Sequence, residues 1–455
     1  MTKEIEWSNL SGVFLDFNLA REFEKLEEKY LVVNKSNSFA NLVNMSTANK
    51  QPFHRWIKYR EGYAGQLVMD ILKRYPINKE KQFMMDPMCG SGSSLLAALS
   101  QDIDGLGLDV NGYAILASNM KGRIYTLEEI EKIEYFIKLL CKDSFEIKEF
   151  YDFDLDGIAK YFPEENFKIL LSIKEWINIK IKNDLIKNLF NLALYAILED
   201  CSNRKKDGNG LATRPTKINN PKARMISQLE MMLEDIKGSL EKRSSFIEAL
   251  DCSALTMDEG INHMKAQTGK SLGTIIFSPP YANSFDYFES YKLELIFGEY
   301  TTVNDLKTAR ERLIRNYRIT KPKQLNFRYA LVEQLCEEIN HKIPLKEAQT
   351  GSRDSRSRLV PNMLRAYFED MYIVCKKAYE QLDYDGTMHI VVDQSSYLGS
   401  PIATDLLLAK ICEDIGFEVK EIIECRKAKT SGQQLKSYPY LKNLLRESII
   451  SVIKH

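Results

Sequence analysis

The stretch D-P-M-C-G-S-G-S-S at residues 86–94 follows the apolar run F-M-M at residues 83–85 and leads into the helical pattern L-L-A-A-L. This order predicts a buried strand, a glycine-rich turn and a helix. Glycines let a ligand approach the backbone, and the first turn of the helix offers free N–H groups to a carboxylate or phosphate. The spacing differs from that of a P-loop and from G-x-G-x-x-G, so a pyrophosphate site is not indicated.

An acidic residue ends the next predicted strand, at residues 105–109. Asp109 lies 23 positions after Asp86 (109 minus 86), close to the ~20-residue offset at which an acid meets ribose hydroxyls. An ordinary helix N-cap is the alternative role for Asp109. The two features together predict a site for a nucleoside that carries something other than pyrophosphate.

The tetrapeptide S-P-P-Y at residues 278–281 follows a second apolar run, G-T-I-I-F at residues 273–277. The Ser278 hydroxyl and the Pro279 carbonyl can accept both N–H bonds of a planar amino group, and the Tyr281 ring can stack on the face of a base. Two prolines after a strand usually just end it. In a chain that also carries the glycine-rich turn, we interpret residues 278–281 as an active site.

These two motifs resemble those of the amino-methylating DNA methyltransferases, the cytosine-N4 and adenine-N6 family of SPPY type that serves bacterial restriction-modification or defence systems. Residues 54–63, H-R-W-I-K-Y-R-E-G-Y, look like the N-terminal cofactor motif of that family, and the R-E-S-I-I at residues 446–450 also fits. The chain departs from the pattern in Met88, where Phe is usual, and in Phe277, where Thr is usual. The resemblance covers residues 50–120 and 245–455 and implies S-adenosylmethionine as the cofactor.

The motifs and the resemblance together give two sets of expected site residues. The catalytic set is Ser278, Pro279, Pro280 and Tyr281. The cofactor set is Tyr59, Arg60, Gly62, Asp86, Met88, Cys89, Gly90, Ser91, Gly92, Asp109, Asp251 and Cys252. The adenine-side role of Asp251 and the role of residues 59–62 at the amino-acid end rest on the resemblance alone. Cys89 has no basic neighbour in sequence, so packing is favoured over a nucleophilic role, and no metal site is expected.

Seven strands are predicted, at residues 82–86, 105–109, 247–251, 273–278, 388–393, 418–425 and 446–453. Strands alternating with helices predict a doubly wound α/β sheet, and the resemblance implies the methyltransferase version, with its last strand antiparallel. The catalytic core is expected at residues 51–120 and 245–455, after a helical extension at 1–50. Residues 120–245 read as a helical insertion and candidate target-recognition region, and residues 287–380 as a second helical insertion.

Three short stretches are basic and loop-like, at residues 202–224, 351–365 and 426–436. For residues 202–224 we favour contact with phosphates. For residues 351–365, contact with phosphates and a merely solvated face are equal alternatives. The expected DNA-binding residues are Arg204, Lys205, Lys206, Asn209, Arg214, Lys217, Arg353, Arg356 and Arg358.

The composition fits a soluble globular protein, with 44% apolar and 28% charged residues. Lys plus Arg and Asp plus Glu are both 63, which argues against nonspecific coating of nucleic acid but leaves room for a local basic cleft. The chain shows no signal-peptide pattern, no membrane-spanning run and no Cys-x-x-Cys pair. A cytoplasmic protein is expected, with double-stranded DNA as partner and a cognate restriction endonuclease as a candidate second partner.

Ser at the head of the tetrapeptide favours cytosine-N4, because adenine enzymes of the group more often carry Asp or Asn there. Adenine-N6 stays open, as does an RNA or protein-amide substrate, because an S-P-P-Y turn can serve any planar amine or amide. A regulatory protein with a degenerate methyltransferase fold is the remaining alternative. Intact Asp86, Gly90, Gly92 and S-P-P-Y argue against that degeneration.

Overall fold

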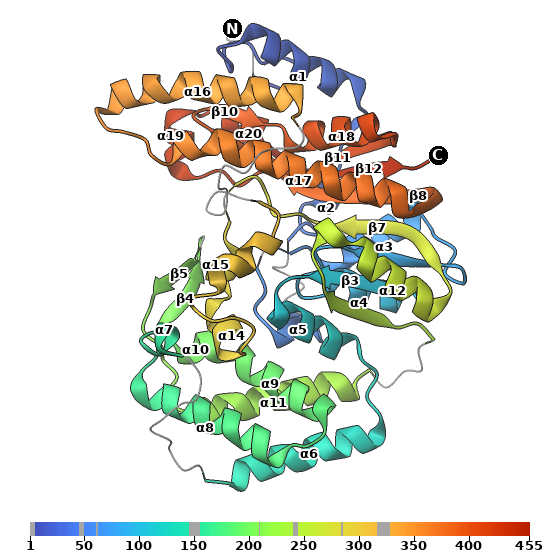
Figure 1. Cartoon of the computed structure of the whole chain (residues 1–455), viewed down its shortest axis with the longest axis vertical. Helices are drawn as coiled ribbons and strands as arrows, with labels where there is room; N and C mark the ends of the chain where they lie inside the picture. The colour runs from blue at the N-terminus through green and yellow to red at the C-terminus, as the bar shows by residue number, and fades with distance from the viewer. Residues whose placement is uncertain are drawn as a thin grey trace.

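An eight-stranded sheet forms the centre of the computed structural model, which describes residues 5–44, 50–60, 62–144, 155–208, 210–239, 244–283, 285–315 and 328–455. All seven predicted strands are present, and the predicted doubly wound α/β fold is confirmed (Figure 1). The strands lie in the order β1 (Val32–Asn34), β11 (Glu418–Lys427), β12 (Arg446–Ile453), β8 (Leu382–Asp393), β7 (Ser271–Phe277), β2 (Gln82–Asp86), β3 (Gly105–Asp109) and β6 (Ile247–Asp251).

The direction of these strands determines where a site can form. Strand β12 is antiparallel to both of its neighbours, as predicted, whereas the pairs β8–β7, β7–β2, β2–β3 and β3–β6 are all parallel. The carboxyl ends of β7, β2, β3 and β6 therefore meet at one edge of the sheet. Ligands of open α/β sheets bind outside this edge, and both sequence motifs begin there.

Strand residues alternate between two hydrophobic cores, as the pleat requires. In β2, Phe83 and Met85 face a core shared with α1 (Phe17–Lys29), α12 (Asp258–Thr268), α16 (Ala330–Thr350), α17 (Val360–Gln381) and α18 (Thr404–Ile415). Met84, between them, faces the opposite core, which includes α2 (Ser36–Phe39), α3 (Gly65–Arg74) and α4 (Ser93–Ser100). All three of these side chains are fully buried, so the sheet is covered on both faces.

A helical lobe lies beside the sheet and has its own core (Figure 1). Helix α5 (Gly112–Gly122), which follows β3, packs into this core and joins the two parts. The other elements of the lobe are α6 (Leu127–Lys142), α7 (Asp156–Ala159), α8 (Glu164–Lys180), α9 (Asp184–Ala196), α10 (Leu198–Cys201), β4 (Arg204–Asp207), β5 (Gly210–Thr213), α11 (Pro221–Lys237), α13 (Tyr287–Ser290), α14 (Lys292–Phe297) and α15 (Leu306–Ala309).

Three sequence expectations need correction. The 287–380 insertion is not one unit, because α13–α15 pack in the helical lobe whereas α16 and α17 pack on the sheet. The stretch 202–224 is not a loop throughout, because β4 and β5 form an antiparallel hairpin in it. The N-terminal extension also adds an edge strand, β1, whose three residues were too short to be predicted from alternation.

The remaining short elements connect the larger ones. They are η2 (His54–Trp56), η3 (Ala254–Thr256), η4 (Arg310–Arg312), η5 (Ser357–Leu359), β9 (Ser395–Tyr397), β10 (Ser400–Ile402), α19 (Gly432–Ser437) and α20 (Leu441–Leu444). No helix within the described ranges has the length and apolar character that a membrane span requires.

Candidate active site

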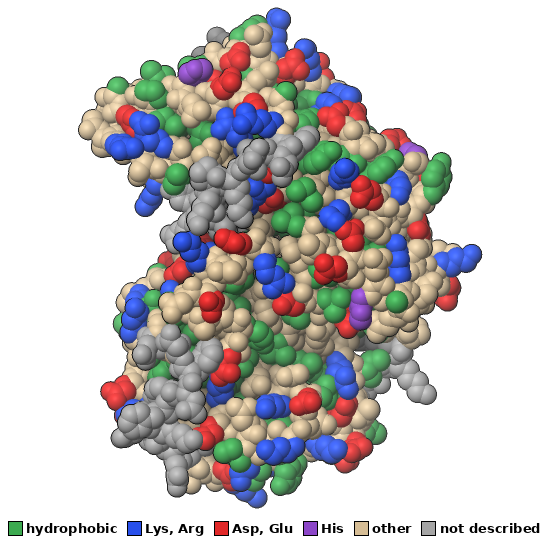
Figure 2. All heavy atoms as spheres, viewed as in Figure 1, with side chains coloured by type: hydrophobic (Ala, Val, Ile, Leu, Met, Phe, Trp, Pro, Cys, Tyr) green, Lys and Arg blue, Asp and Glu red, His purple; other side chains and the backbone are tan. Residues whose placement is uncertain are grey.

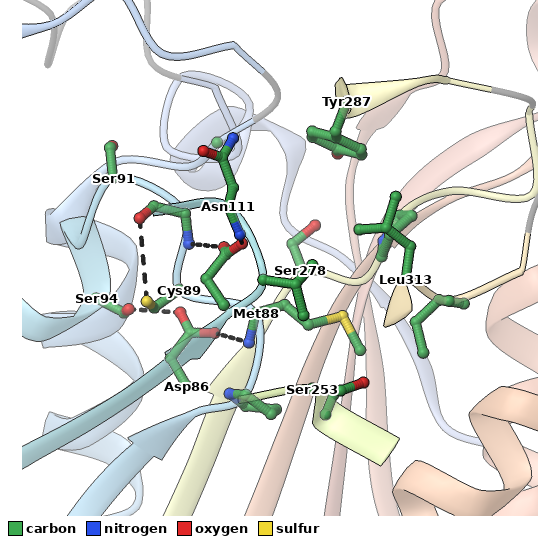
Figure 3. A pocket seen from close by; sticks show the side chains of 18 of the residues that line it. Asp86, Met88, Cys89, Ser91, Ser94, Asn111, Ser253, Ser278, Tyr287 and Leu313 are labelled. Carbon is green, nitrogen blue, oxygen red and sulfur yellow. Dashed lines mark hydrogen bonds between the residues drawn. The ribbon is translucent and has the colours of Figure 1, made fainter. Parts of the chain in front are cut away.

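A cleft of about 870 Å³, counting its open mouth, lies at the carboxyl edge of the sheet. Its walls come from the ends of β2, β3, β6 and β7, from Tyr59, Gly62 and Tyr63 before α3, and from residues 312–314. Figure 3 shows Asp86, Cys89 and Ser94 on one side, with Leu313 and Ser253 facing Met88 across the cleft.

Asp86 ends β2 at the base of the cleft and is 2% exposed. Its Oδ2 accepts hydrogen bonds from the Tyr63 hydroxyl at 3.0 Å and the Ser94 hydroxyl at 2.5 Å, and its Oδ1 accepts one from the Met88 N–H at 3.0 Å. Burial raises the pKa of the Asp86 carboxyl to about 6, although the three donors oppose this shift. Asp86 therefore holds the start of the glycine-rich turn and places a titratable acid against the ligand.

The glycines of the turn adopt left-handed conformations that other residues resist, with φ of +49° at Gly90 and +79° at Gly92. A Cβ at Gly90 would lie 2.7 Å from the Tyr59 ring, and one at Gly92 would lie 2.7 Å from the Ser118 hydroxyl. Gly90 lines the cleft. Gly92 caps α4 outside the cleft lining, so its part is to shape the turn.

Helix α5 fixes the turn from behind. The Ser118 hydroxyl donates to the Gly90 carbonyl at 3.0 Å, and the Lys121 ammonium donates to the Ser91 carbonyl at 3.0 Å. Lys121 is 1% exposed, and burial lowers its pKa to about 7. Neither residue carried a motif that would have selected it from sequence.

Asp109 ends β3 and borders the cleft, at the position predicted for a ribose ligand. Its carboxylate accepts hydrogen bonds from the Gly90 N–H at 2.8 Å and the Asn111 N–H at 2.9 Å. Burial raises the pKa of Asp109, and these backbone donors oppose the rise. Its carboxylate thus ties the β3 end to the glycine-rich turn.

Asn111 is a site residue that sequence reasoning missed. It is 3% exposed and lines the cleft, on the same side as Ser91 in Figure 3. Its Oδ1 accepts from the N–H groups of Tyr113 and Ala114 as the N-cap of α5, which leaves Nδ2 facing elsewhere. Within the described part of the chain, Nδ2 has no hydrogen-bond partner. A buried donor without a partner is costly, so this group indicates a ligand acceptor.

Replacing Asn111 with serine should weaken cofactor binding about two- to ten-fold, the range expected for one net hydrogen bond. Serine is an equally good N-cap, so α5 should stay intact. Isothermal titration of the cofactor, with the thermal midpoint of the free protein as the control, checks this expectation. Unchanged affinity in a normally folded variant would show that Nδ2 does not contact the cofactor.

The predicted catalytic turn enters the same cleft. Ser278 and Pro280 line it together with Met88, because β7 and β2 are adjacent parallel strands. The Tyr281 hydroxyl donates to Glu447 of β12 at 2.9 Å. Arg426 in turn pairs with Glu447. A chain of polar side chains therefore connects the catalytic turn to the antiparallel strand.

The cleft gathers most but not all of the predicted residues. Its lining includes Tyr59, Gly62, Asp86, Met88, Cys89, Gly90, Ser91, Asp109, Cys252, Ser278 and Pro280. Pro279 and Tyr281 belong to the catalytic turn but lie outside this lining. The Arg60 guanidinium instead donates to the Lys206 carbonyl, and Asp251 pairs with Arg312 at 2.6 Å. These two contacts argue against direct cofactor contacts by the Arg60 and Asp251 side chains.

The basic residues predicted to bind DNA lie on both halves of the protein. The β4–β5 hairpin and the turn between α16 and α17 lie on one side of the molecule in Figure 1, and Figure 2 shows this side hollowed between them. The exposed members are Arg214, Lys217, Arg353, Arg356 and Arg358, and Arg204 and Lys205 are half-buried. Arg358 pairs with Glu347 at 2.6 Å and Arg214 with Asp207 at 2.8 Å, both in the exposed surface.

Two members of that set need comment. Lys206 is 6% exposed and its ammonium is held by Glu199 and Glu294. A buried ion pair of this kind is unsuited to phosphate contact, so the prediction for Lys206 is wrong on grounds of access. Asn209 lies outside the described residues.

Comparison with known proteins shows which class of protein the chain resembles. No protein-family model matches the chain. Type II methyltransferase M.BsoBI of Geobacillus stearothermophilus is 28% identical over 93% of this chain and 90% of its own length. Type II methyltransferase M.AvaI of a Nostoc species is 27% identical over 86% and 85%, and M.MvaI of Kocuria varians is 24% identical over 62% and 65%.

The predicted resemblance is therefore confirmed: the chain is a relative of type II methyltransferases, and S-adenosylmethionine is the methyl donor. Among solved structures, rRNA methyltransferase aviRa from Streptomyces viridochromogenes matches with a TM-score of 0.27 and 9% identity, over 86% of this chain and 85% of that chain. That likeness is too weak to support an argument.

The dimensions and polar groups of the cleft fit this cofactor. The ends of β7, β2, β3 and β6 span three strand spacings, about 14 Å, which suits an extended nucleoside with an amino-acid tail. The Asn111 amide, which has no hydrogen-bond partner among the described residues, supplies a donor. Asp86 and Asp109 supply acidic groups for a ligand that carries positive charge and hydroxyls. Gly90 leaves open the space beside Tyr59 that a side chain would fill.

Proposed function

We propose that the protein is a site-specific DNA methyltransferase that methylates the exocyclic amino group of a flipped base, with cytosine-N4 favoured. One observation carries this proposal: Ser278 and Pro280 of the S-P-P-Y turn line the same cleft as Asp86, Met88 and Asp109 of the cofactor half. The acceptor pair for an amino group thus lies beside the place for the methyl donor. Proximity of this kind supplies much of the rate enhancement in group transfer.

The chemistry follows from the polarity of the catalytic turn. An exocyclic amine is a weak nucleophile because its lone pair is conjugated into the ring, and acceptors for both N–H groups favour a pyramidal nitrogen. A serine hydroxyl carries two lone pairs, so Ser278 can accept one of these bonds. The Pro279 carbonyl is proposed as the second acceptor. When bound, S-adenosylmethionine supplies an electrophilic sulfonium methyl for in-line attack by this nitrogen.

Tyr281 is proposed to stack on the extruded base. Its hydroxyl is fixed by Glu447, which limits how the ring can turn. Taking a base out of the duplex costs a few kcal/mol, and stacking offsets part of that cost. Pro280 and the partly buried Tyr287 at the cleft wall would help to exclude water.

Target recognition is proposed for residues 120–245 with help from residues 287–380. The hairpin on the helical lobe and the turn before α17 flank a hollow. Exposed arginines lie on that turn, and the exposed Arg214 directly follows the hairpin. Contacts to phosphates position a duplex, whereas base identity is read in its grooves. A duplex in this hollow would meet basic groups from both halves at once, with a cognate restriction endonuclease as the candidate partner in the cell.

The favoured base is tested by expressing the protein in a methylation-free bacterial host and sequencing single molecules of genomic DNA. We expect N4-methylcytosine at one recurrent motif. N6-methyladenine would keep the mechanism and overturn the choice of base. A catalytically inactive Ser278→Ala variant in the same host is the matched control.

Failure to modify DNA would redirect the proposal. If the protein binds S-adenosylmethionine and leaves DNA unmethylated, transfer of labelled methyl groups to RNA or to protein should be measured next. An S-P-P-Y turn can hold any planar amine or amide, so these acceptors are the chemical alternatives. The absence of cofactor binding would instead favour a regulatory protein with a degenerate site.

A further inference from the structure

Residues 310–315, R-E-R-L-I-R, form a strap that crosses the cleft between the two halves of the protein. Leu313 packs against the core of the helical lobe, whereas Ile314 is buried in the core of the sheet half. Arg312, Leu313 and Ile314 all line the cleft. The strap comes from the second insertion, and no sequence motif marked it.

Three arginines hold the strap, each to a different element. Arg310 pairs with Asp286 at 3.1 Å and with Glu289 of α13 at 3.3 Å. Arg315 pairs with Glu369 at 2.5 Å and Asp370 at 2.6 Å of α17, and these partners are nearly inaccessible. The ends of the strap are thus well anchored, one to each half.

The middle of the strap is held more weakly, directly over the cleft. Arg312 pairs with Asp251 at 2.6 Å, and the two side chains are 45% and 61% exposed. The Ser253 hydroxyl donates to the Arg312 carbonyl at 2.8 Å. Asp251 is the last residue of β6 and Ser253 lies two positions after it. Both contacts therefore hold the middle of the strap against the end of this one strand.

The strand order identifies the part of the cofactor beneath the strap. The catalytic turn follows β7, the glycine-rich turn follows β2, Asp109 ends β3, and Asp251 ends β6. With the methyl group near β7 and the ribose near β3, the adenine falls at the β6 end. There the cleft wall is apolar, with Val110, Ala254 and Ile314 among its residues, which suits the faces of a base.

We infer that the strap is the outer wall of the adenine site and that the Arg312–Asp251 pair is its latch, which slows cofactor release. Asp251 then acts through Arg312 and is not itself an adenine ligand. This inference rests on the proposed placement of S-adenosylmethionine in the cleft. It does not depend on which base or polymer is methylated.

The test is the dissociation rate of methyl-labelled S-adenosylmethionine, chased with unlabelled cofactor in the absence of nucleic acid. Arg312→Ala, Asp251→Ala and the double variant should each release the cofactor about two- to five-fold faster, the range for one exposed ion pair. The double variant should be no faster than either single one, because all three break the same contact. Arg123→Ala is the matched control, since Arg123 is 46% exposed and pairs with Glu129 at 3.1 Å away from the cleft.

The salt dependence of the dissociation rate distinguishes loss of the ion pair from loss of folding. Salt screens an exposed pair, so the rate ratio between variant and wild type should approach one at high salt. If Asp251→Ala released the cofactor more than ten-fold faster while Arg312→Ala released it at the wild-type rate, Asp251 would be a direct ligand. That result would overturn the latch. Unchanged rates in all variants would also overturn it, and a wild-type protein that binds no cofactor would overturn the proposed site as well.

Discussion

Replacing Ser278 with alanine should lower the methylation rate by at least about a hundred-fold, the usual effect of removing one group that stabilises a transition state. The substitution removes the proposed acceptor for the amino group. It leaves Asp86, the glycine-rich turn and Asn111 untouched, so cofactor affinity should change less than about two-fold. Single-turnover methyl transfer to DNA and titration of the cofactor measure the two quantities separately.

Two variants of Tyr281 separate the role of its hydroxyl from the role of its ring. Tyr281→Phe keeps the ring and removes the hydroxyl that donates to Glu447. Tyr281→Ala removes the ring as well, so the loss of methylation should be larger in that variant. Equal losses would show that stacking contributes nothing. Loss of cofactor binding in the Ser278 or Tyr281 variants would contradict the division between a cofactor half and a catalytic half.

Cofactor affinity should fall about ten-fold between pH 7 and pH 5 because of Asp86. The pKa of its carboxyl is raised from 3.8 to about 6, so most of the group is protonated at pH 5. A ligand that carries positive charge favours the ionised form. Binding of S-adenosylmethionine, measured by titration across this range, should follow one ionisation near pH 6.

The contribution of Asp86 to the free energy of unfolding should change with pH in the opposite direction. Because the folded pKa of Asp86 lies above the unfolded one, its contribution to stability is complete below about pH 4 and is lost as the pH rises through about 6. The shift of about two units corresponds to about 3 kcal/mol.

Asp86→Asn removes this ionisation and is the matched variant. Its stability relative to wild type should rise with pH across this window, while its cofactor affinity should be low and independent of pH. Denaturant unfolding at pH 4 and pH 7 checks the first expectation. A wild-type affinity that stays constant from pH 5 to pH 8 would exclude Asp86 as the titrating group.

The local motifs could be read from the sequence because each specifies its own backbone. The apolar run before residue 86, the glycines at 90 and 92 and the apolar helix after them determine a strand, a turn and a helix within about fifteen residues. The tetrapeptide at 278–281 likewise ends a strand that a short apolar run with β-branched residues predicts. The seven main strands and the doubly wound fold followed from such short-range patterns, and the cofactor followed from the family resemblance that the motifs carry.

The tertiary structure decided which side chains cooperate, since these contacts join residues that are far apart in the chain. Tyr281 meets Glu447 across 166 positions, Arg312 meets Asp251 across 61, and Lys206 is buried against Glu294 across 88. Charge in the sequence does not reveal whether a lysine is exposed or paired. An N-cap asparagine does not reveal that its amide lacks a hydrogen-bond partner within the described ranges. Those properties depend on how the helical lobe packs beside the sheet, so only the folded chain determines the strap, the surroundings of the Asn111 amide and the polar contacts of Tyr281.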